Sequence, residues 1–343
     1  MSRDDALGGL LVAGLASLLA MSPAAGEPPA DFYRGKNVSF IIGSGQAGVY
    51  DLGGRLMARH LARFIPGNPT LVPQNMPGAS SLRAASYIYS AAPRDGTVLG
   101  TAQPTIILNK LLDPAARYEP AKYMWIGRLQ PMTLVGIAWK GAANHTMADT
   151  KERKLTVGAS GASGTSAIVP WALNRLAGTN FQVVLGYQSQ TPQLLAMERG
   201  ELEGVGSSSL SDILAKEDWI TNDKVTFLYT IAAERSPKLP DVPTIVEFAQ
   251  NDLDRTVLRL LGSVSEIGFT IMAPPGMAAE RTAVLREAFL EMVKDPDFLS
   301  EAAKIGLEPE PLRGEDLQKV VADTLGATGE ALTKLREITR PPR

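Results

Sequence analysis

Two glycine-rich segments contain the residue types from which a small-molecule site can be built. The first places Gly43, Gly45 and Gly48 in the order G-x-G-x-x-G, directly after the apolar run Val38–Ile42. A strand, such a turn and a helix together present unpaired backbone N–H groups and the positive end of a helix dipole to an anion. The same spacing is typical of a dinucleotide-binding turn, so NAD is the first ligand to consider.

The dinucleotide interpretation lacks its second requirement. A dinucleotide site places an acidic residue at the end of the second strand, about 20 residues further on, to bind the ribose hydroxyls. The second strand here ends in Pro73, Gln74 and Asn75, none of which is acidic. We therefore expect no cofactor. The same backbone geometry binds a carboxylate as readily as a phosphate, so a carboxylate ligand remains possible at this turn.

The second segment, "GASGASGTS" at residues 158–166, is similar in composition to the first. No lysine follows its last glycine, so it is not a Walker A phosphate loop. The hydroxyls of Ser160, Ser163 and Thr165 can donate hydrogen bonds to an anion without carrying charge. Serine and threonine also cap helices routinely, and both roles can apply at once. We expect ligand contact because similar turns occur twice in the chain.

Asp51 is the acidic residue nearest to the first turn. It either caps the following helix or faces the ligand, and in the second case it would favour a hydroxyl or ammonium group beside the ligand's carboxylate. Arg55 is expected on the solvated side of that helix. The residues predicted to contact the ligand are Ser44, Gly45, Gln46, Asp51, Gln103, Thr105, Ser160, Ser163, Gly164, Thr165, Tyr187, Gln188 and Ser207.

Composition excludes several other kinds of site. The 343 residues include no cysteine and two histidines, His60 and His145, so thiolate chemistry, disulfides and a multi-histidine metal centre are not expected. The 34 basic and 36 acidic residues nearly cancel and are scattered, which argues against nucleic-acid binding. The remaining polar residues form no acid–base pair at a defensible spacing. An exported enzyme is therefore the weakest of the functions considered.

The N-terminus predicts export. Leu7–Ala20 is an apolar run of the length of a signal-peptide core and is followed by small residues at cleavage spacing. We assign residues 1–26 to a signal peptide and place the mature chain in the periplasm. An uncleaved membrane anchor is the alternative. No later stretch approaches the 18 apolar residues of a membrane span.

Strand and helix patterns alternate along the rest of the chain. The expected strands are Val38–Ile42, Thr70–Pro73, Val98–Ala102, Leu134–Trp139, Leu155–Ala159, Val183–Gly186, Val205–Ser207, Val225–Ile231 and Phe269–Ala273. The expected helices include Leu52–Phe64, Leu82–Ser90, one from about Ile168 and three after Pro275. Two β–α series predict an α/β protein of two lobes, each with a mostly parallel sheet flanked by helices. Ligands bind such sheets beyond the carboxyl ends of the strands.

Longer segments carry a family resemblance. The runs "IPGNPTLVPQNMPGAS", "APRDGT", "LPDVPT" and "APPGMAAERTAVLREAFLEMVKDPDFLSEA" make the chain similar to Bug-type (TctC-like) periplasmic solute-binding receptors of tripartite tricarboxylate transporters. The resemblance implies a type II periplasmic binding-protein fold, with residues 27–130 plus 263–343 in lobe 1 and residues 131–262 in lobe 2. It further implies hinge closure on a small organic acid and delivery of that acid to integral-membrane transporter subunits. Nothing in the sequence argues against a monomer, which is the state we expect.

Two segments depart from the family pattern. Many members have Pro-Gly-Gly in the first turn, where this chain has residues Ser44–Gly48, and Tyr187-Gln188-Ser189-Gln190 replaces the usual Tyr-Lys/Arg-Gly. The missing cation favours a monocarboxylate or a polar, partly neutral acid over a longer di- or tricarboxylate. A ligand-sensing partner of a periplasmic sensor domain is an alternative function, because its cleft would have the same sequence features.

Overall fold

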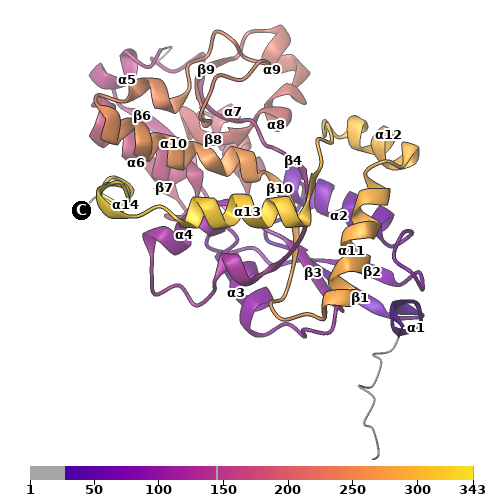
Figure 1. Ribbon diagram of the computed structural model, residues 1–343. Coiled ribbons are helices and arrows are strands. Elements are labelled where there is room, and N and C mark those ends of the chain that lie inside the picture. The colour runs from indigo at the N-terminus through magenta and orange to yellow at the C-terminus, as the bar shows by residue number, and fades with distance from the viewer. Residues whose placement is uncertain (1–27, 144–145, 343) are drawn as a thin grey trace, which may run out of the picture.

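The computed structural model of the protein describes residues 28–143 and 146–342. The predicted signal peptide, residues 1–26, and His145 lie outside the described residues. Two β-sheets form the centres of two lobes, which lie at the upper left and lower right of Figure 1. Sheet A and its helices are called lobe 1 below, and sheet B and its helices lobe 2.

Sheet A has the strand order β11-β4-β10-β3-β1-β2. Its strands are β1 (Asn37–Ile42), β2 (Thr70–Asn75), β3 (Val98–Thr101), β4 (Met124–Gln130), β10 (Phe269–Ala273) and β11 (Leu312–Arg313). Strands β1, β2 and β3 pair in parallel, whereas β10 is antiparallel to both of its neighbours. Pro73 lies in β2 at the edge of the sheet, where a residue without an N–H group is tolerated.

Sheet B has the order β7-β6-β8-β5-β9. Its strands are β5 (Leu134–Trp139), β6 (Leu155–Ala159), β7 (Phe181–Leu185), β8 (Gly204–Ser209) and β9 (Val225–Thr230). The strands β7, β6 and β8 are parallel, and β5 is antiparallel to β8 and β9. Without β11, the two sheets have the same topology. In each sheet, the strand that enters from the other lobe is antiparallel to both of its neighbours: β10 lies between β3 and β4, and β5 lies between β8 and β9.

The helices cover both faces of each sheet (Figure 1). They are α1 (Pro29–Tyr33), α2 (Val49–Leu61), α3 (Leu82–Ser90), α4 (Thr105–Leu112), α5 (Asp149–Glu152), α6 (Thr165–Ala177), α7 (Gln190–Glu198), α8 (Leu210–Leu214), α9 (Glu217–Thr221), α10 (Asp252–Ile267), α11 (Ala279–Met292), α12 (Pro296–Lys304), α13 (Gly314–Leu325) and α14 (Gly329–Ile338). Two short 3-10 helices, Pro120–Lys122 and Ile245–Phe248, lie in the connections.

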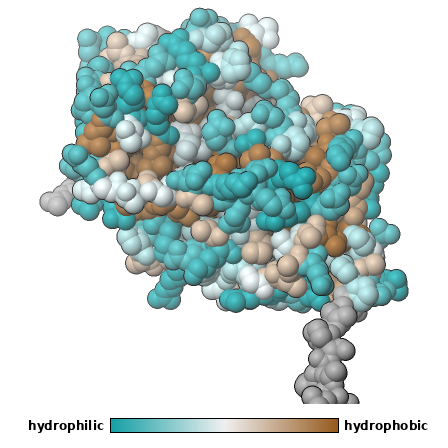
Figure 2. Space-filling view, in the orientation of Figure 1, coloured by the Kyte–Doolittle hydropathy of each residue, from teal (hydrophilic) through white to brown (hydrophobic). Residues whose placement is uncertain are grey.

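The core of lobe 1 lies on the two faces of sheet A. On one face, α2 and α11 bury Met57, Leu285, Phe289 and Met292 in one cluster. Helices α3, α4 and α13 cover the other face. The outer side of α13 follows the hydrophilic band across the middle of Figure 2. No helix in the described part of the chain is long and apolar enough to cross a membrane.

The core of lobe 2 includes side chains from two helices that follow lobe 1 elements along the chain, α4 and α14. Leu335 and Ile338 of α14, together with Leu108 of α4, are buried in one cluster with the α6 and sheet B side chains. The Arg175 guanidinium of α6 donates to the Ile338 carbonyl at 2.6 Å. The C-terminal helix α14 therefore packs on lobe 2, although α13 before it packs on β4 of sheet A.

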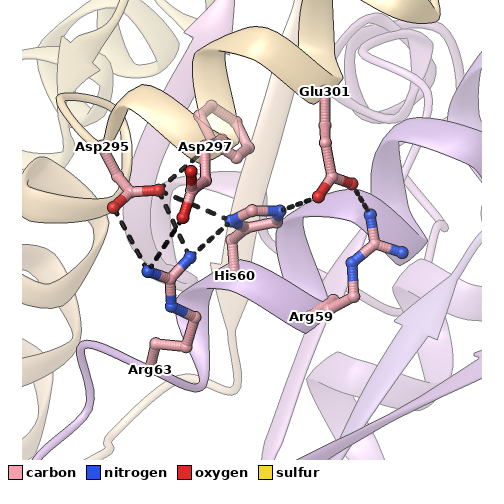
Figure 3. Close-up of polar contacts among 7 residues, drawn as sticks. Arg59, His60, Arg63, Asp295, Asp297 and Glu301 are labelled. Atoms are coloured by element: carbon pink, nitrogen blue, oxygen red, sulfur yellow. Dashed lines mark hydrogen bonds and ion pairs between the residues drawn. The ribbon is translucent and has the colours of Figure 1, made fainter.

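The last turn of α2 is fixed to α12 by charged side chains. Figure 3 shows the His60 imidazole between two carboxylates, with Asp295 Oδ1 3.8 Å from its Nδ1 and Glu301 Oε1 3.3 Å from its Nε2. Arg59 pairs with Glu301, and Arg63 pairs with Asp295. Asp295 also accepts a hydrogen bond from the Phe298 N–H and so caps α12. The end of α2 remote from the first glycine turn is thereby held in place.

The strand predictions differ from the structure chiefly in their ends. Strand β2 runs two residues beyond the predicted Pro73, and α6 begins three residues before the expected Ile168. The sequence patterns predicted no strand at β4 and no helix at α4 or α10. The prediction of a two-lobed α/β fold is confirmed, with the refinement that each sheet has a parallel half and an antiparallel half.

Candidate functional site

The two glycine-rich turns lead into helices in the same way. Gly48 is the N-cap of α2, with φ −98° and ψ 171°, and Gly164 is the N-cap of α6, with φ −87° and ψ 154°. Neither helix start has a side-chain cap. No N-cap side chain therefore occupies the first backbone N–H groups of either helix, which is the arrangement that the likeness of the two turns predicts.

Both helix starts face one pocket between the lobes, with a volume of about 70 Å³, which is called the helix-end pocket below. It is lined by Ser44, Gly48, Val49, Tyr50, Gln103, Pro104, Thr105, Met132, Leu134, Ser160, Thr165, Ser166, Ser189, Gln190, Gln193, Ser207, Ser209 and Asp212. These residues include the starts of α2, α4, α6 and α7. Four helix N-termini thus direct positive partial charge toward one small volume.

The wall of the helix-end pocket contains no basic side chain among the described residues, and its one acidic side chain is Asp212 of α8. The Val49 backbone N–H of α2 hydrogen bonds to the Asp212 carboxylate. Burial raises the pKa of Asp212 to about 6, and the Val49 hydrogen bond opposes that rise. Burial and the nearby Asp212 also raise the pKa of the Tyr50 hydroxyl. Lobe 2 therefore brings its own carboxylate to the start of a lobe 1 helix.

Three side-chain atoms of the helix-end pocket are fully enclosed and have no hydrogen-bond partner among the described residues. They are Thr105 Oγ1, Gln193 Oε1 and Asp212 Oδ2. Gln193 donates from Nε2 to the Ser189 carbonyl at 3.2 Å, which assigns Oε1 as the free end of its amide. Six other enclosed side-chain atoms of the described residues also lack a hydrogen-bond partner, but these three belong to residues of the pocket wall, where a bound molecule or water can supply one.

A second pocket of about 340 Å³ adjoins the first and is called the Ser80 pocket below. It is lined by Gly43, Pro77, Gly78, Ala79, Ser80, Ser81, Arg83, Gln103, Ser160, Gly186, Tyr187 and Gln188. Gln103 and Ser160 line both pockets. The Ser80 pocket differs from the helix-end pocket in having a cation, Arg83, in its wall.

The turn that carries Ser80 has an unusual backbone. Ala79, Ser80 and Ser81 have φ values of 46°, 53° and 73°, the left-handed region that residues with a Cβ rarely enter. The Ser81 hydroxyl stabilises the turn, because it donates to the Gly43 carbonyl at 2.7 Å and accepts from the Gln103 N–H at 3.1 Å. Such strained segments concentrate at functional sites.

Small side chains join the lobes directly beside the two pockets. Ser80 Oγ lies 3.1 Å from Ser160 Oγ, and Ser163 Oγ donates to the Ala79 carbonyl at 3.2 Å. On the other side, Thr191 Oγ1 donates to the Ala47 carbonyl at 3.1 Å. A Cβ added at Gly164 would lie 2.6 Å from Ser80 Oγ, so this approach requires glycine. The two lobes are therefore in direct contact beside both pockets.

The structure places most of the predicted site residues at this interface. Ser44, Gln103, Thr105, Ser160, Thr165 and Ser207 line the helix-end pocket, whereas Tyr187 and Gln188 line the Ser80 pocket with Gln103 and Ser160. Gly45, Ser163 and Gly164 lie at contacts between the lobes. Gln46 is exposed and lines neither pocket.

Asp51 also lines neither pocket. Its carboxylate is buried and accepts from the Ala47 N–H at 3.0 Å, from Arg55 Nε at 2.8 Å and from Asn75 Nδ2 at 2.9 Å. Gly48, not Asp51, is the N-cap of α2. Arg55, expected on the solvated side, is bound between Asp51 and Asn75, although its side chain is 41% exposed. Asp51 therefore stabilises the first turn through hydrogen bonds on the side away from the two pockets.

Sequence reasoning missed the residues that the closed lobes bring in from further along the chain. These are Tyr50, Ser80, Arg83, Ser189, Gln190, Gln193, Ser209 and Asp212. Ser80 ends the family-like segment "IPGNPTLVPQNMPGAS", and Arg83 lies three residues after it. Asp212 had one available signal, because it follows the serine-rich end of a predicted strand, where side chains of an open α/β sheet meet ligands.

Residues 55–336 match the family described as the tripartite tricarboxylate transporter family receptor, TctC. This match covers most of the chain. The protein belongs to the TctC receptor family. Among curated proteins, the "UPF0065 protein in gbd 5'region" of Cupriavidus necator is 24% identical over 334 residues, which are 95% of each chain.

Solved structures of TctC-family type share the fold. The periplasmic binding protein BugD superimposes with a TM-score of 0.71 at 18% identity, covering 89% of this chain and 98% of its own. MatC from Rhodopseudomonas palustris, solved with bound malate, gives a TM-score of 0.68 at 19% identity and covers 89% and 99%. In this TctC-family chain, the described residues contain no group of three or more side chains suited to holding a metal ion.

Proposed function

We propose that the protein is a periplasmic receptor that captures a small organic carboxylate between its two lobes and delivers it to the membrane subunits of a tripartite tricarboxylate-type transporter. It acts as a monomer and performs no chemistry on its ligand. The observation that carries this proposal is that four helix N-termini line one pocket at the lobe interface. Family membership and the malate-bound structure of MatC support it.

The mechanism follows from where the pocket's donors come from. Ser44, Tyr50 and Thr105 belong to lobe 1, whereas Thr165, Ser166 and Ser207 belong to lobe 2. A ligand carboxylate makes both sets of contacts only when the lobes are together, so binding shifts the protein toward the closed state. Hydroxyl and backbone N–H donors hold the anion without a basic side chain, and ordered water can bridge the longer distances.

Thermal unfolding in the presence of carboxylic acids tests the proposal. A ligand at 100 times its dissociation constant stabilises the folded state by about 2.7 kcal/mol, which raises the melting temperature by several degrees. We expect acids to raise the melting temperature and their neutral amides to have no effect. Ligand recovered after incubation should be chemically unchanged. Silence across the panel, or turnover of an acid, contradicts the proposal.

A further inference from the structure

The wall of the helix-end pocket combines four helix N-termini with two side-chain acceptor atoms that have no partner among the described residues. Gln193 Oε1 can only accept, and an ionised Asp212 Oδ2 can only accept. Both atoms are enclosed, lack partners among the described residues and belong to side chains that line the pocket. A plain carboxylate, which has acceptors alone, cannot satisfy either atom.

We propose that the ligand carries an ammonium group beside its carboxylate, and that Asp212 is the residue that selects it, so the receptor binds an amino acid. The inference rests on the proposed function, since it concerns the same interlobe pocket. The ammonium supplies donors for Asp212 Oδ2 and Gln193 Oε1, while the carboxylate meets the N–H groups of the helix starts. The remainder of the ligand extends past Gln103 and Ser160 into the Ser80 pocket.

Charge balance favours the same assignment. Asp212 already holds the Val49 N–H at the start of α2, which a ligand carboxylate would otherwise take. A second carboxylate in so small a pocket meets the Asp212 charge at close range, and the described pocket wall has no basic side chain to offset it. A zwitterion avoids this repulsion because its cation faces the carboxylate.

The protonation of Asp212 gives the inference a second readout. Tyr50 is the only other titratable side chain among the described residues of the pocket wall, and burial keeps its hydroxyl neutral. Because the pKa of Asp212 is about 6, its charge is present at pH 7.5 and largely absent at pH 5. Affinity for an ammonium ligand should therefore rise with pH, whereas affinity for a plain acid should fall.

The test compares matched triplets of an amino acid, its 2-hydroxy acid and its unsubstituted acid, from three to six carbons, by calorimetry with the full mature chain. We expect one or more amino acids to bind at least tenfold more tightly than their unsubstituted acids at pH 7.5. Asp212→Asn should remove that preference and its pH dependence. Asp212→Ser provides a second variant should the first fold poorly. Glu217→Gln, an exposed acid on α9, removes one charge outside the pocket and should change nothing.

The outcomes separate the inference from the proposed function. Unsubstituted acids that bind as tightly as amino acids, with Asp212→Asn having no effect, overturn the inference and leave carboxylate capture in place. A chain that binds no member of any triplet contradicts both. Amino-acid binding that persists unchanged in Asp212→Asn overturns the role of Asp212.

Discussion

The hydroxyl oxygens of Ser80 and Ser160 lie 3.1 Å apart, and this contact joins lobe 1 to lobe 2 beside the two pockets. Gly164 lies against the same Ser80 hydroxyl, and its missing side chain allows the contact to form. This contact between the lobes therefore depends on a glycine and two serines, and a single hydroxyl–hydroxyl hydrogen bond contributes only about 1 kcal/mol.

Enlarging Gly164 should hold the lobes apart. Gly164→Leu is expected to abolish ligand binding, because the new side chain occupies the position of Ser80, while the melting temperature of the unliganded protein stays within a few degrees. Solution scattering should give a larger radius of gyration than the wild-type protein has. Gly164→Ala should weaken binding several-fold, and Ser80→Gly should restore it by removing the hydroxyl that the new Cβ meets at 2.6 Å. Unchanged affinity in Gly164→Leu contradicts the placement of the site.

Asp212 should reduce the stability of the folded protein at neutral pH. Its pKa is raised from 3.8 to about 6, so the folded state binds a proton that the unfolded state has released, and stability falls as pH rises between these values. The full shift corresponds to about 3 kcal/mol as an upper bound. Asp212→Asn should therefore be more stable than wild type at pH 7.5 and equal to it near pH 4. Urea unfolding at both pH values measures the difference, and a variant less stable at pH 7.5 contradicts it.

Asp51 should matter for stability and not for ligand choice. Asp51→Ala leaves Arg55 and Asn75 without their shared acceptor and frees the turn at Ala47, for an expected loss of about 2–3 kcal/mol in urea unfolding. Asp51→Asn keeps one acceptor and should lose less. Both variants should rank amino acids and unsubstituted acids in the wild-type order. A changed ranking would place Asp51 in the site after all.

Asp295 should stabilise α12 through its capping hydrogen bond. Asp295→Ala removes the acceptor of the Phe298 N–H and the partner of Arg63, and we expect a loss of about 1–2 kcal/mol. The neighbouring Asp297 is 74% exposed, and its ion pair within the described part of the chain is with Arg63 at 3.5 Å, so Asp297→Ala should change stability by less than about 0.5 kcal/mol. Equal losses in the two variants would contradict the capping role.

The sequence was most informative where local rules decide the structure. The likeness of the turns at Gly48 and Gly164 follows from composition alone, and the structure gives both glycines the same place before a helix. Most strands of both sheets were predictable for the same reason, since apolar runs between turn residues need no knowledge of the partner strand, although β4 was missed.

The composition of the pocket was not predictable, because it depends on lobe closure. Asp51 is close to the first turn in sequence, yet its carboxylate points back to the Ala47 N–H. Asp212 lies 161 residues after Asp51, in a helix of five residues too short to show periodicity, and reaches the pocket only because the lobes meet. Helix α4 is short and apolar, a pattern that fits a buried strand equally well.

Helix α6 extends from the pocket to the core that lobe 2 shares with α14. Its first end is the Gly164 N-cap, and near its other end Arg175 is bonded to α14. At 1.5 Å per residue, these points are about 16 Å apart along the axis. A pivot near Arg175 would therefore make α6 a lever arm, on which a rotation of about 20° displaces Gly164 by about 6 Å. Such a displacement separates Ser80 from Ser160 while the apolar contacts around α14 remain almost stationary.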